Sequence, residues 1–296
     1  MVSMFNELQG ELKINEPLSQ HTSWRVGGKA QRFYQPKDKS DLASFLRQLP
    51  SDEPLLWLGL GSNLLIRDGG FAGTVISMAG TMQALDIDGQ TVTAEVGVYC
   101  SKVAKQSAKQ GLSGAAFLAG IPGTFGGALA MNAGAHGWET WQLVKEATTV
   151  TRQGELKKRP ATDFNVSYRH VELPEKEWFV SATLELEVGD AEAETALIKQ
   201  LLKKRNDSQP TNQPCAGSVF RNPQGDYAGR LIEHCGLKGL RVGGASVSSK
   251  HANFIVNDGA ASAADIEALI NLVRQRVEEE TKVRLIPEVH IIGDYA

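Results

Sequence analysis

Two glycine-rich segments constrain the fold of this chain more than any other feature of its sequence. They are GLGSNLL (residues 59–65) and AGIPGTFGGALAMNAGA (residues 119–135), and each follows an apolar, strand-like run. Glycine permits positive φ angles and close backbone approach, so that successive backbone N–H groups can form a concave site for an anion such as phosphate. Ser62 and Thr124 could each add a hydrogen bond to that phosphate.

Neither segment is one of the common phosphate-binding motifs. After Gly59 and Gly61, the third glycine position of a Rossmann fingerprint is Leu64, and no Gly-Lys-Ser/Thr follows at P-loop spacing. Taken singly, each segment could be only a set of tight turns in a β-rich domain, because short glycine motifs are often false positives. Taken together, the two segments favour phosphate binding.

Composition and charge exclude several classes of protein. The 296 residues are 42% hydrophobic and 22% charged, which is ordinary for a globular protein, and the length suits two or three modest domains or one large one. A formal net charge of −3 provides no basic field for nucleic acid. The longest apolar runs are far shorter than a membrane span, and residues 1–18 lack the apolar core of a signal peptide. We therefore expect a cytoplasmic protein that binds neither nucleic acid nor membrane.

The cysteines indicate a reducing compartment. There are three, Cys100, Cys215 and Cys235, with no C-x-x-C spacing. An odd number at irregular spacing argues against a disulfide or zinc framework, and we expect no metal site.

Hydrophobic periodicity predicts a chain of mixed α and β elements. The best helix covers residues 262–281, where Ser262 and Asp265 resemble a capping box and apolar residues recur at helical spacing. A helix over 40–49 is expected to have Ser40 as its N-cap. Further helices are expected at 99–111, 190–205 and 227–236, hairpins turning at Asp88-Gly89 and at Gly154, and strands at 177–188, 251–257 and 283–293. The polar, proline-containing segment 206–214 predicts a linker.

Several motifs, in this order, carry a resemblance to a known family. They are HTSWRVGG, LGLGSNLLIRDGGFAGTVI, AGIPGTFGGALAMNAGA, SYRH, GSVFRNP, AGRLIEHCGLKGLRVGGASVSSKHANFIVN and IPEVHIIG. The chain resembles the UDP-N-acetylenolpyruvoylglucosamine reductases, flavoenzymes of bacterial peptidoglycan synthesis. The resemblance covers nearly the whole chain, and the compact C-terminal part is similar to the shorter type, which lacks a substrate-covering tyrosine loop.

The resemblance implies an α+β fold with an FAD-binding domain of the vanillyl-alcohol-oxidase type in two subdomains, followed by a C-terminal α+β substrate domain. We expect the subdomains at residues 1–80 and 81–205 and the substrate domain at 206–296. The family's flavin-binding motifs correspond to Gly59, Gly61, Ser62, Asn63, Leu64, Gly120, Pro122, Gly123, Thr124, Gly126 and Gly127. No histidine lies in the first glycine segment, so FAD should be bound non-covalently, with the nearby His21 structural.

The reaction that the family implies is reduction of an enolpyruvyl ether, with hydride from reduced flavin, NADPH as the hydride source, and a proton donated to carbon. Ser218 alone would be interpreted as a turn residue, because serine commonly makes local turn hydrogen bonds. The resemblance instead implies that Ser218, in its Gly-Ser-x-Phe-x-Asn-Pro pattern, is the proton donor. A hydroxyl can protonate a carbanionic carbon, which is far more basic than water.

Two charged residues complete the implied catalytic set. An arginine such as Arg169 is usually solvated or in a weak ion pair, but a guanidinium can also bind a carboxylate through two parallel hydrogen bonds. Glu288 could be an outward-facing strand residue, although Pro287 favours an edge or irregular position. The family's catalytic arginine and third catalytic residue correspond to Arg169 and Glu288, where the guanidinium would hold the enolpyruvyl carboxylate and the carboxyl group could share a proton with the enol.

The anionic substrate requires cationic and polar partners. Candidates are Asn222, Arg205, Gln209, Lys238 and His251, together with Arg221. Two other functions stay open from the residues. A related FAD oxidase would have no need for Ser218, Arg169 and Glu288 together, and a flavin-binding module without catalysis would tolerate their loss. We expect a monomer that binds a small-molecule substrate, UDP-N-acetylglucosamine enolpyruvate.

Overall fold

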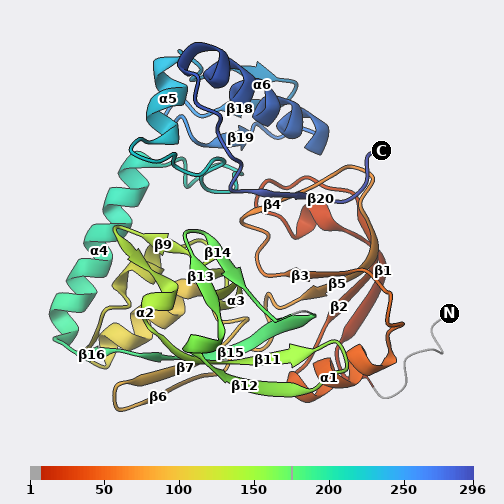
Figure 1. Cartoon of the computed structure of the whole chain (residues 1–296), viewed down its shortest axis with the longest axis vertical. Coiled ribbons are helices and arrows are strands. Elements are labelled where there is room, and N and C mark those ends of the chain that lie inside the picture. The colour runs from red at the N-terminus through yellow and green to blue at the C-terminus, as the bar shows by residue number, and fades with distance from the viewer. Residues whose placement is uncertain (1–7, 175) are drawn as a thin grey trace. The chain divides into compact units, whose positions relative to one another are not determined.

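The chain folds into two compact units, each assembled from segments that are distant in sequence (Figure 1). The structure, a computed structural model, describes residues 8–174 and 176–296. The first unit comprises the described parts of residues 1–13, 33–59 and 74–203, and the second comprises 14–32, 60–73 and 204–296. The boundaries expected between the two FAD-binding subdomains, at 80/81, and before the substrate domain, at 205/206, stay predictions.

A five-stranded antiparallel sheet forms the framework of the first unit. Its strands, in spatial order, are β12 (Leu156–Pro160), β11 (Val144–Thr151), β15 (Glu177–Glu185), β7 (Thr91–Glu95) and β6 (Leu85–Asp88). Both predicted hairpins are confirmed, because β6 pairs with β7 and β11 pairs with β12. Gly89 and Gly154 adopt positive φ angles of 55° and 74°, which glycine accepts without steric cost.

A second sheet has the strand order β1-β2-β5-β3, with bounds Glu11–Pro17, Lys29–Gln35, Phe71–Ser77 and Leu55–Leu58. In the first unit, β3 pairs in parallel with residues 74–77 of β5. The glycine-rich segment 59–65 begins directly after β3, so this strand fixes where the segment starts.

The helices of the first unit follow the predicted apolar periodicity. Helix α2 (Cys100–Lys109) buries Val103, Ala104 and Ala108 along one face. The shorter helices are α1 (Lys39–Gln48) and α3 (Phe125–Ala130), and α4 (Ala191–Ser208) continues three residues beyond its predicted end. The predicted Ser40 cap is wrong: the N-cap lies two residues earlier, at Asp38, whose carboxylate accepts a hydrogen bond from the Asp41 N–H at 2.9 Å. Aspartate is as good an N-cap as serine, and the apolar pattern alone does not discriminate between them.

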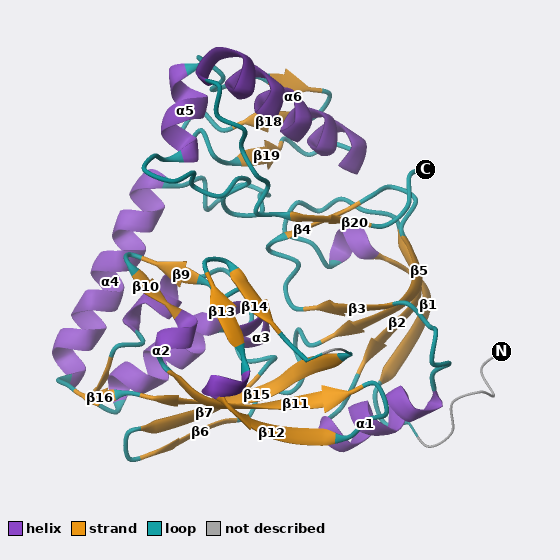
Figure 2. Cartoon of the chain, in the orientation of Figure 1, coloured by secondary structure: helices purple, strands orange, loops and turns teal. Residues whose placement is uncertain are grey.

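The second unit is built around the long helix α6 (Ala263–Thr281), which lies against β18 and β19 (Figure 2). The predicted capping box is confirmed, with Ser262 Oγ accepting from the Asp265 N–H and Asp265 Oδ2 accepting from the Ser262 N–H, both at 3.0 Å. The predicted apolar stripe is buried in the core of this unit: Ile266, Leu269, Ile270, Val273 and Val277. The other elements are α5 (Ala228–His234), the sheet β17 (Arg241–Val242), β18 (Ala245–Val247) and β19 (Ile255–Asn257), and the parallel pair β4 (Leu64–Ile66) and β20 (His290–Ile292).

Trp24 ties an N-terminal segment into the core of the second unit. Its side chain is fully buried, and its indole Nε1–H donates to the Ile255 carbonyl at 2.8 Å. The Asn257 side-chain amide returns a hydrogen bond to the Trp24 carbonyl, also at 2.8 Å. The C-terminal sheet therefore shares one core with residues from the start of the chain.

Shorter elements include β8 (Leu112–Ser113), β9 (Gly134–Ala135), β10 (Trp138–Glu139), β13 (Asn165–Ser167), β14 (His170–Glu172), β16 (Glu187–Val188), and four 3₁₀ helices, Leu18–Gln20, Ala116–Gly120, Thr140–Gln142 and Ala161–Asp163. The strands predicted at 251–257 and 283–293 are shorter than expected, because only Ile255–Asn257 and His290–Ile292 are paired as strands. Across residues 8–174 and 176–296, no helix combines the length and apolarity needed to cross a lipid bilayer.

Candidate active site

The second glycine-rich segment packs directly against the turn between β7 and α2. The Phe125 N–H donates to the Val98 carbonyl at 2.7 Å, and the Gly126 N–H donates to the Val96 carbonyl at 2.9 Å. A Cβ atom at Gly126 would lie 2.7 Å from the Val96 Cβ, closer than real Cβ contacts come. Glycine is therefore required here for close packing, and this packing fixes the start of α3.

The first and second glycine-rich segments meet at Gly59 and Thr124. A Cβ atom at Gly59 would lie 2.5 Å from Thr124 Oγ1. A cavity of about 130 Å³ opens beside this contact, and its walls include Gly59, Gly126, Gly127, Trp57 and Trp178. The predicted flavin-binding residues of the first unit therefore surround a space that a side chain on Gly59 would begin to fill.

The rest of the first glycine-rich segment belongs to the second unit. Gly61 has a φ angle of +59°, and a Cβ atom there would lie 2.3 Å from the His21 carbonyl oxygen. The ring of His21 bonds to the Glu16 carboxylate, with 2.8 Å between Nε2 and Oε1. Asn63 reaches the far end of the chain, because its side-chain amide donates to the Glu288 carbonyl at 3.1 Å.

The remaining predicted flavin-binding residues occupy the two glycine-rich segments as follows. Gly120 ends the 3₁₀ helix Ala116–Gly120, Pro122 is exposed, and the Gly123 carbonyl accepts a hydrogen bond from the Cys100 N–H at 3.1 Å. Ser62 is half-buried, and Leu64 opens strand β4.

Arg169 lies at the tip of the hairpin formed by β13 and β14, in the first unit. Its φ angle is +56°, a left-handed conformation that is uncommon for a residue other than glycine. Its guanidinium donates to two carbonyl oxygens of the second glycine-rich segment, Asn132 at 3.3 Å and Gly134 at 3.0 Å. The Glu139 carboxylate is 3.6 Å from Nη1. The predicted catalytic arginine is thus attached to a predicted flavin-binding segment.

Ser218 and Glu288 lie on neighbouring segments of the second unit. The Glu288 N–H donates to the Val219 carbonyl at 2.7 Å, and the Arg221 N–H donates to the Ile286 carbonyl at 2.9 Å. Both residues are half-buried, outside any named strand. Because Asn63 binds the Glu288 carbonyl, the structure brings together three predicted site residues that are up to 225 positions apart. Arg169 belongs to the other unit.

Asn253 holds the backbone beside Ser218, and the sequence analysis did not identify it. Its side chain is almost fully buried and binds Phe220 twice, with Oδ1 accepting from the N–H at 3.0 Å and Nδ2 donating to the carbonyl at 2.8 Å. Its own carbonyl accepts from the Val219 N–H at 2.9 Å. These bonds fix the backbone directly after Ser218. In the sequence, the only sign that could have pointed to Asn253 is its place in KHANF, part of a motif that carries the family resemblance.

The predicted substrate-binding residues fall into small clusters within the second unit. Lys238 Nζ pairs with Glu233 Oε1 at 2.6 Å, and burial together with the nearby Lys238 charge lowers the pKa of His251. Arg205 Nε donates to Gln209 Oε1 at 3.3 Å, and burial lowers the pKa of Arg205.

Asn222 and Arg221 lie beside the Ser218 segment. Asn222 is exposed, but its Oδ1 accepts from the Ala228 N–H at 3.1 Å and so caps the first turn of α5. The Nε atom of Arg221 is buried with no hydrogen-bond partner among the described residues.

The described residues contain no group of three or more His, Cys, Asp or Glu side chains placed to hold a metal ion. Burial raises the pKa of the Cys100 thiol to about 12, so this cysteine is neutral and inert.

Comparisons with known proteins agree with the arrangement of these motifs. Residues 30–158 match the family described as an FAD binding domain, and residues 209–292 match the UDP-N-acetylenolpyruvoylglucosamine reductase C-terminal domain. The crystal structure of UDP-N-acetylenolpyruvylglucosamine reductase from Thermus caldophilus is 32% identical, with a TM-score of 0.82, covering 96% of this chain and 99% of that one. The expected FAD-binding domain followed by a C-terminal substrate domain of mixed α and β elements is confirmed at the level of these two family matches and the reductase structure.

Curated relatives are similar over almost their whole length. UDP-N-acetylenolpyruvoylglucosamine reductase from Alkalilimnicola ehrlichii is 57% identical over 96% of this chain and 96% of its own. The protein of the same name from Legionella pneumophila (strain Corby) is 57% identical over 99% of this chain and 96% of its own. With both domain matches in order, this chain belongs to the UDP-N-acetylenolpyruvoylglucosamine reductase family.

Proposed function

We propose that this protein uses FAD and NADPH to reduce UDP-N-acetylglucosamine enolpyruvate to UDP-N-acetylmuramate in peptidoglycan precursor synthesis. Family membership supports the overall reaction. The observation that carries the assignment of residues is the pairing of the Ser218 segment with the Glu288 segment, beside Asn63 of the first glycine-rich segment. In this proposal the protein acts as a monomer in the bacterial cytoplasm.

FAD, when bound and reduced by NADPH, supplies the hydride for the vinyl carbon remote from the substrate carboxylate. The two glycine-rich segments would hold it without a covalent bond, through Gly59, Gly61, Ser62, Asn63, Leu64, Gly120, Pro122, Gly123, Thr124, Gly126 and Gly127. The residues fit such a group, because the two segments approach each other closely at Gly59 and Thr124 and a largely apolar cavity adjoins this contact. Backbone N–H groups exposed by glycine suit the diphosphate.

Three side chains would then serve the substrate. The Arg169 guanidinium binds the enolpyruvyl carboxylate and stabilises the negative charge that develops when the adjacent carbon gains electron density. Ser218 Oγ donates a proton to that carbon. Glu288 shares a proton with the enol-like oxygen. Asn253 keeps the Ser218 backbone in place for this transfer.

The anionic diphosphate of the substrate would be bound by the polar groups of the second unit. Lys238, His251, Arg205, Gln209 and Asn222 are the proposed partners. Arg221 adds a further candidate, because its buried Nε has no partner among the described residues, and leaving such a donor unpaired costs free energy.

This function can be tested under anaerobic conditions by following the colour of the protein, first on adding NADPH and then on adding the substrate. We expect the purified protein to be yellow, to be bleached by NADPH, and to recover its colour when the enolpyruvyl substrate is added. Recovery with oxygen but not with substrate would indicate an oxidase. A yellow protein that NADPH does not bleach would indicate a flavin-binding module without catalysis.

A further inference from the structure

Two short hairpins of the first unit meet at Arg169. The strands β13 and β14 form one hairpin, with Arg169 at its tip, and the strands β9 and β10 form the other (Figure 2). In the second hairpin, Glu139 is paired with Gly134 across the ladder. The Arg169 guanidinium donates to the Gly134 carbonyl at 3.0 Å, and its Nη1 lies 3.6 Å from Glu139 Oε1. One pair of opposed residues therefore supplies both a backbone acceptor and a negative charge to the predicted catalytic arginine.

The absence of a side chain on Gly134 leaves room for this contact. A Cβ atom there would lie 3.0 Å from Arg169 Nη1 and 3.0 Å from Glu139 Cγ, which is tighter than most real Cβ contacts. The same atom would lie 2.4 Å from the Trp138 carbonyl oxygen. Arg169 and Glu139 thus approach each other over a glycine, where any side chain would crowd both of them.

Asn132 holds the Glu139 carboxylate independently of Arg169. The Asn132 residue is only 2% exposed, and its Nδ2 donates to Glu139 Oε2 at 2.8 Å. Its Oδ1 accepts from the Trp141 N–H at 3.1 Å, which fixes the orientation of the amide. The same Nδ2 donates to the Ser167 carbonyl in β13 at 3.2 Å, and the Asn132 carbonyl accepts from Arg169 Nη1 at 3.3 Å. A carboxylate held in this way is in place before any ligand arrives.

The pair formed by Glu139 and Arg169 contributes little to folding stability. The two side chains are 31% and 17% exposed, and their separation of 3.6 Å is longer than that of a good hydrogen bond. Ion pairs that are partly open to water stabilise a fold only weakly. Catalysis is far more sensitive to direction, because displacing a positioned group by about 1 Å can slow a reaction about 100-fold. The arrangement is therefore better explained by the orientation of the guanidinium than by stability.

We infer that Glu139 is a positioning residue, which directs the Arg169 guanidinium toward the enolpyruvyl carboxylate of the substrate. This role rests on the function proposed above for Arg169. Without Glu139 the guanidinium keeps its charge and can still attract the carboxylate. Glu139 therefore acts mainly on the alignment of Arg169 with the charge that develops during the reaction, and less on substrate affinity. Asn132 fixes the Glu139 carboxylate, and Gly134 leaves the space in which the two charges meet.

The test follows the oxidation of the reduced, FAD-containing protein by the enolpyruvyl substrate in an anaerobic stopped-flow instrument. Glu139→Gln keeps an oxygen that can accept the Asn132 hydrogen bond, and it removes the charge near Arg169. We expect the rate constant at saturating substrate to fall about 10-fold, while the half-saturating concentration changes by less than about 2-fold. The matched control is Glu146→Gln in β11, where a 29% exposed carboxylate pairs with Lys158 at 2.6 Å. This control should be oxidised like the wild type.

A double-mutant cycle with Arg169→Lys separates positioning from a general effect on the fold. If Glu139 acts through the guanidinium, Glu139→Gln should slow the oxidation of Arg169→Lys protein by less than about 2-fold. Equal slowing in both backgrounds would overturn the inference, because independent effects multiply. So would a wild-type rate constant in Glu139→Gln, or a change confined to the half-saturating concentration. If Glu139→Gln does not fold, Glu139→Asp takes its place in the cycle and is judged by the same outcomes, since the shorter side chain withdraws the carboxylate from Arg169.

The wild type and Arg169→Lys separate failure of this inference from failure of the proposed function. If the substrate does not oxidise the reduced wild type, the proposed function fails and the role of Glu139 fails with it. If Arg169→Lys is oxidised as fast as the wild type, Arg169 does not bind the substrate carboxylate, and Glu139 cannot act through it. If Arg169→Lys is slow while Glu139→Gln is oxidised at the wild-type rate, only the role of Glu139 is wrong.

Discussion

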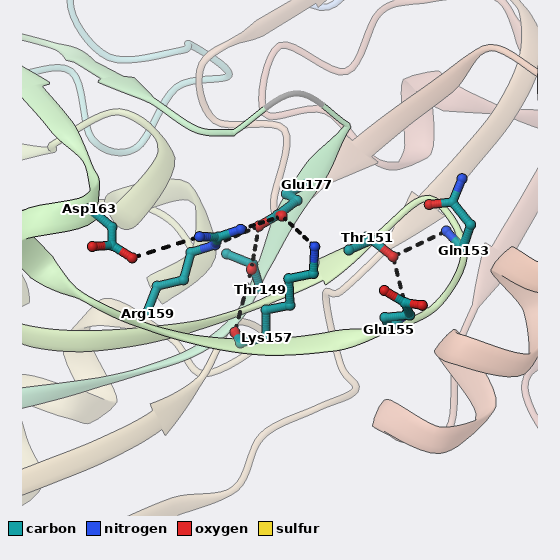
Figure 3. Close-up of polar contacts among 8 residues, drawn as sticks. All are labelled: Thr149, Thr151, Gln153, Glu155, Lys157, Arg159, Asp163 and Glu177. Atoms are coloured by element: carbon teal, nitrogen blue, oxygen red, sulfur yellow. Dashed lines mark hydrogen bonds and ion pairs between the residues drawn. The ribbon is translucent and has the colours of Figure 1, made fainter.

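Arg159 and Arg169 lie ten positions apart in the first unit, and their polar partners differ. Arg159, in β12, binds the buried Glu177 carboxylate with both prongs of its guanidinium, Nε to Oε2 at 2.8 Å and Nη2 to Oε1 at 2.6 Å (Figure 3). Arg169 instead donates to the carbonyl oxygens of Asn132 and Gly134, and the Glu139 carboxylate is farther from its guanidinium, at 3.6 Å. The carbonyls position the guanidinium, and the more distant carboxylate neutralises its charge less than Glu177 neutralises that of Arg159.

The cluster around Glu177 shows what a structural ion pair looks like in this protein. Thr149 Oγ1 donates to Glu177 Oε2 at 2.7 Å, Lys157 Nζ is 3.5 Å from Oε1, and Asp163 is 3.7 Å from Arg159 (Figure 3). Hydrogen bonds from Arg159 lower the pKa of Glu177 to about 2. Through these contacts the Glu177 carboxylate, in β15, connects this strand to β11 and β12. The comparison shows that Arg159 makes two close hydrogen bonds to one carboxylate, whereas Arg169 donates to two backbone carbonyls, as the proposed ligand role of Arg169 requires.

The largest expected effect concerns Ser218, which should matter for chemistry and not for the fold. Ser218→Ala should stay yellow and be bleached by NADPH as fast as the wild type, because that half-reaction needs no acid at carbon. Reoxidation by the enolpyruvyl substrate should slow by about 100- to 10,000-fold, the usual cost of removing a general acid. Stopped-flow absorbance measures both steps.

Ser218→Cys supplies the control, since a thiol can still donate a proton and should retain more activity than alanine. A Ser218→Ala trace that reoxidises as fast as the wild type would mean that Ser218 is only a turn residue. In that case its loss would change stability by no more than about 0.5 kcal/mol.

Glu177→Gln tests the structural half of the comparison. Removing one partner of a buried, doubly hydrogen-bonded pair leaves the other charge poorly matched, and we expect a loss of about 2–3 kcal/mol in the free energy of unfolding. Turnover by the folded fraction should not change. Urea denaturation measures the loss, and an unchanged midpoint would show that the cluster in Figure 3 contributes nothing to stability.

Arg169→Lys tests the other half of the comparison, the arginine proposed to bind the substrate. An ammonium keeps the charge but cannot bind a carboxylate through two parallel bonds, so kcat/KM for the enolpyruvyl substrate should fall by about 10- to 100-fold. The free energy of unfolding should change by less than in Arg159→Lys, the matched substitution at the structural arginine. A loss of stability with unchanged activity in Arg169→Lys would mean that Arg169 stabilises the fold and does not bind the substrate.

The smallest expected effect is a pH dependence of stability. The folded-state pKa of Glu177 is about 2, below the ordinary value of 4.5, so its ionised form stabilises the folded protein above pH 4.5. That stability is lost as the pH falls from about 4.5 towards 2. Between pH 6 and pH 3.5 we expect the wild type to lose about 1 kcal/mol more than Glu177→Gln, which lacks the titrating group. Parallel stability curves for the two proteins would remove Glu177 as the cause.

Local elements were predictable from the sequence because their signals are local. The hairpins at Gly89 and Gly154 and the capping box of α6 depend on residues within a few positions of one another. The helix cap at Asp38 was not predicted, because Asp38 and Ser40 are both good capping residues. Which of them caps the helix depends on the path of the chain before the helix, which the local sequence does not specify. The final strand was predicted too long, because Pro287 lies against Phe220 rather than in a strand.

The sequence by itself determined the periodic helices, the glycine-dependent turns and, through the order of its motifs, the family. Only the tertiary structure decided which of those motifs are neighbours. Asn63 bonds to Glu288 across 225 positions, and Asn253 fixes the backbone after Ser218. Periodicity and capping act through contacts a few residues apart, whereas these relations arise from packing between distant segments, which no local pattern encodes.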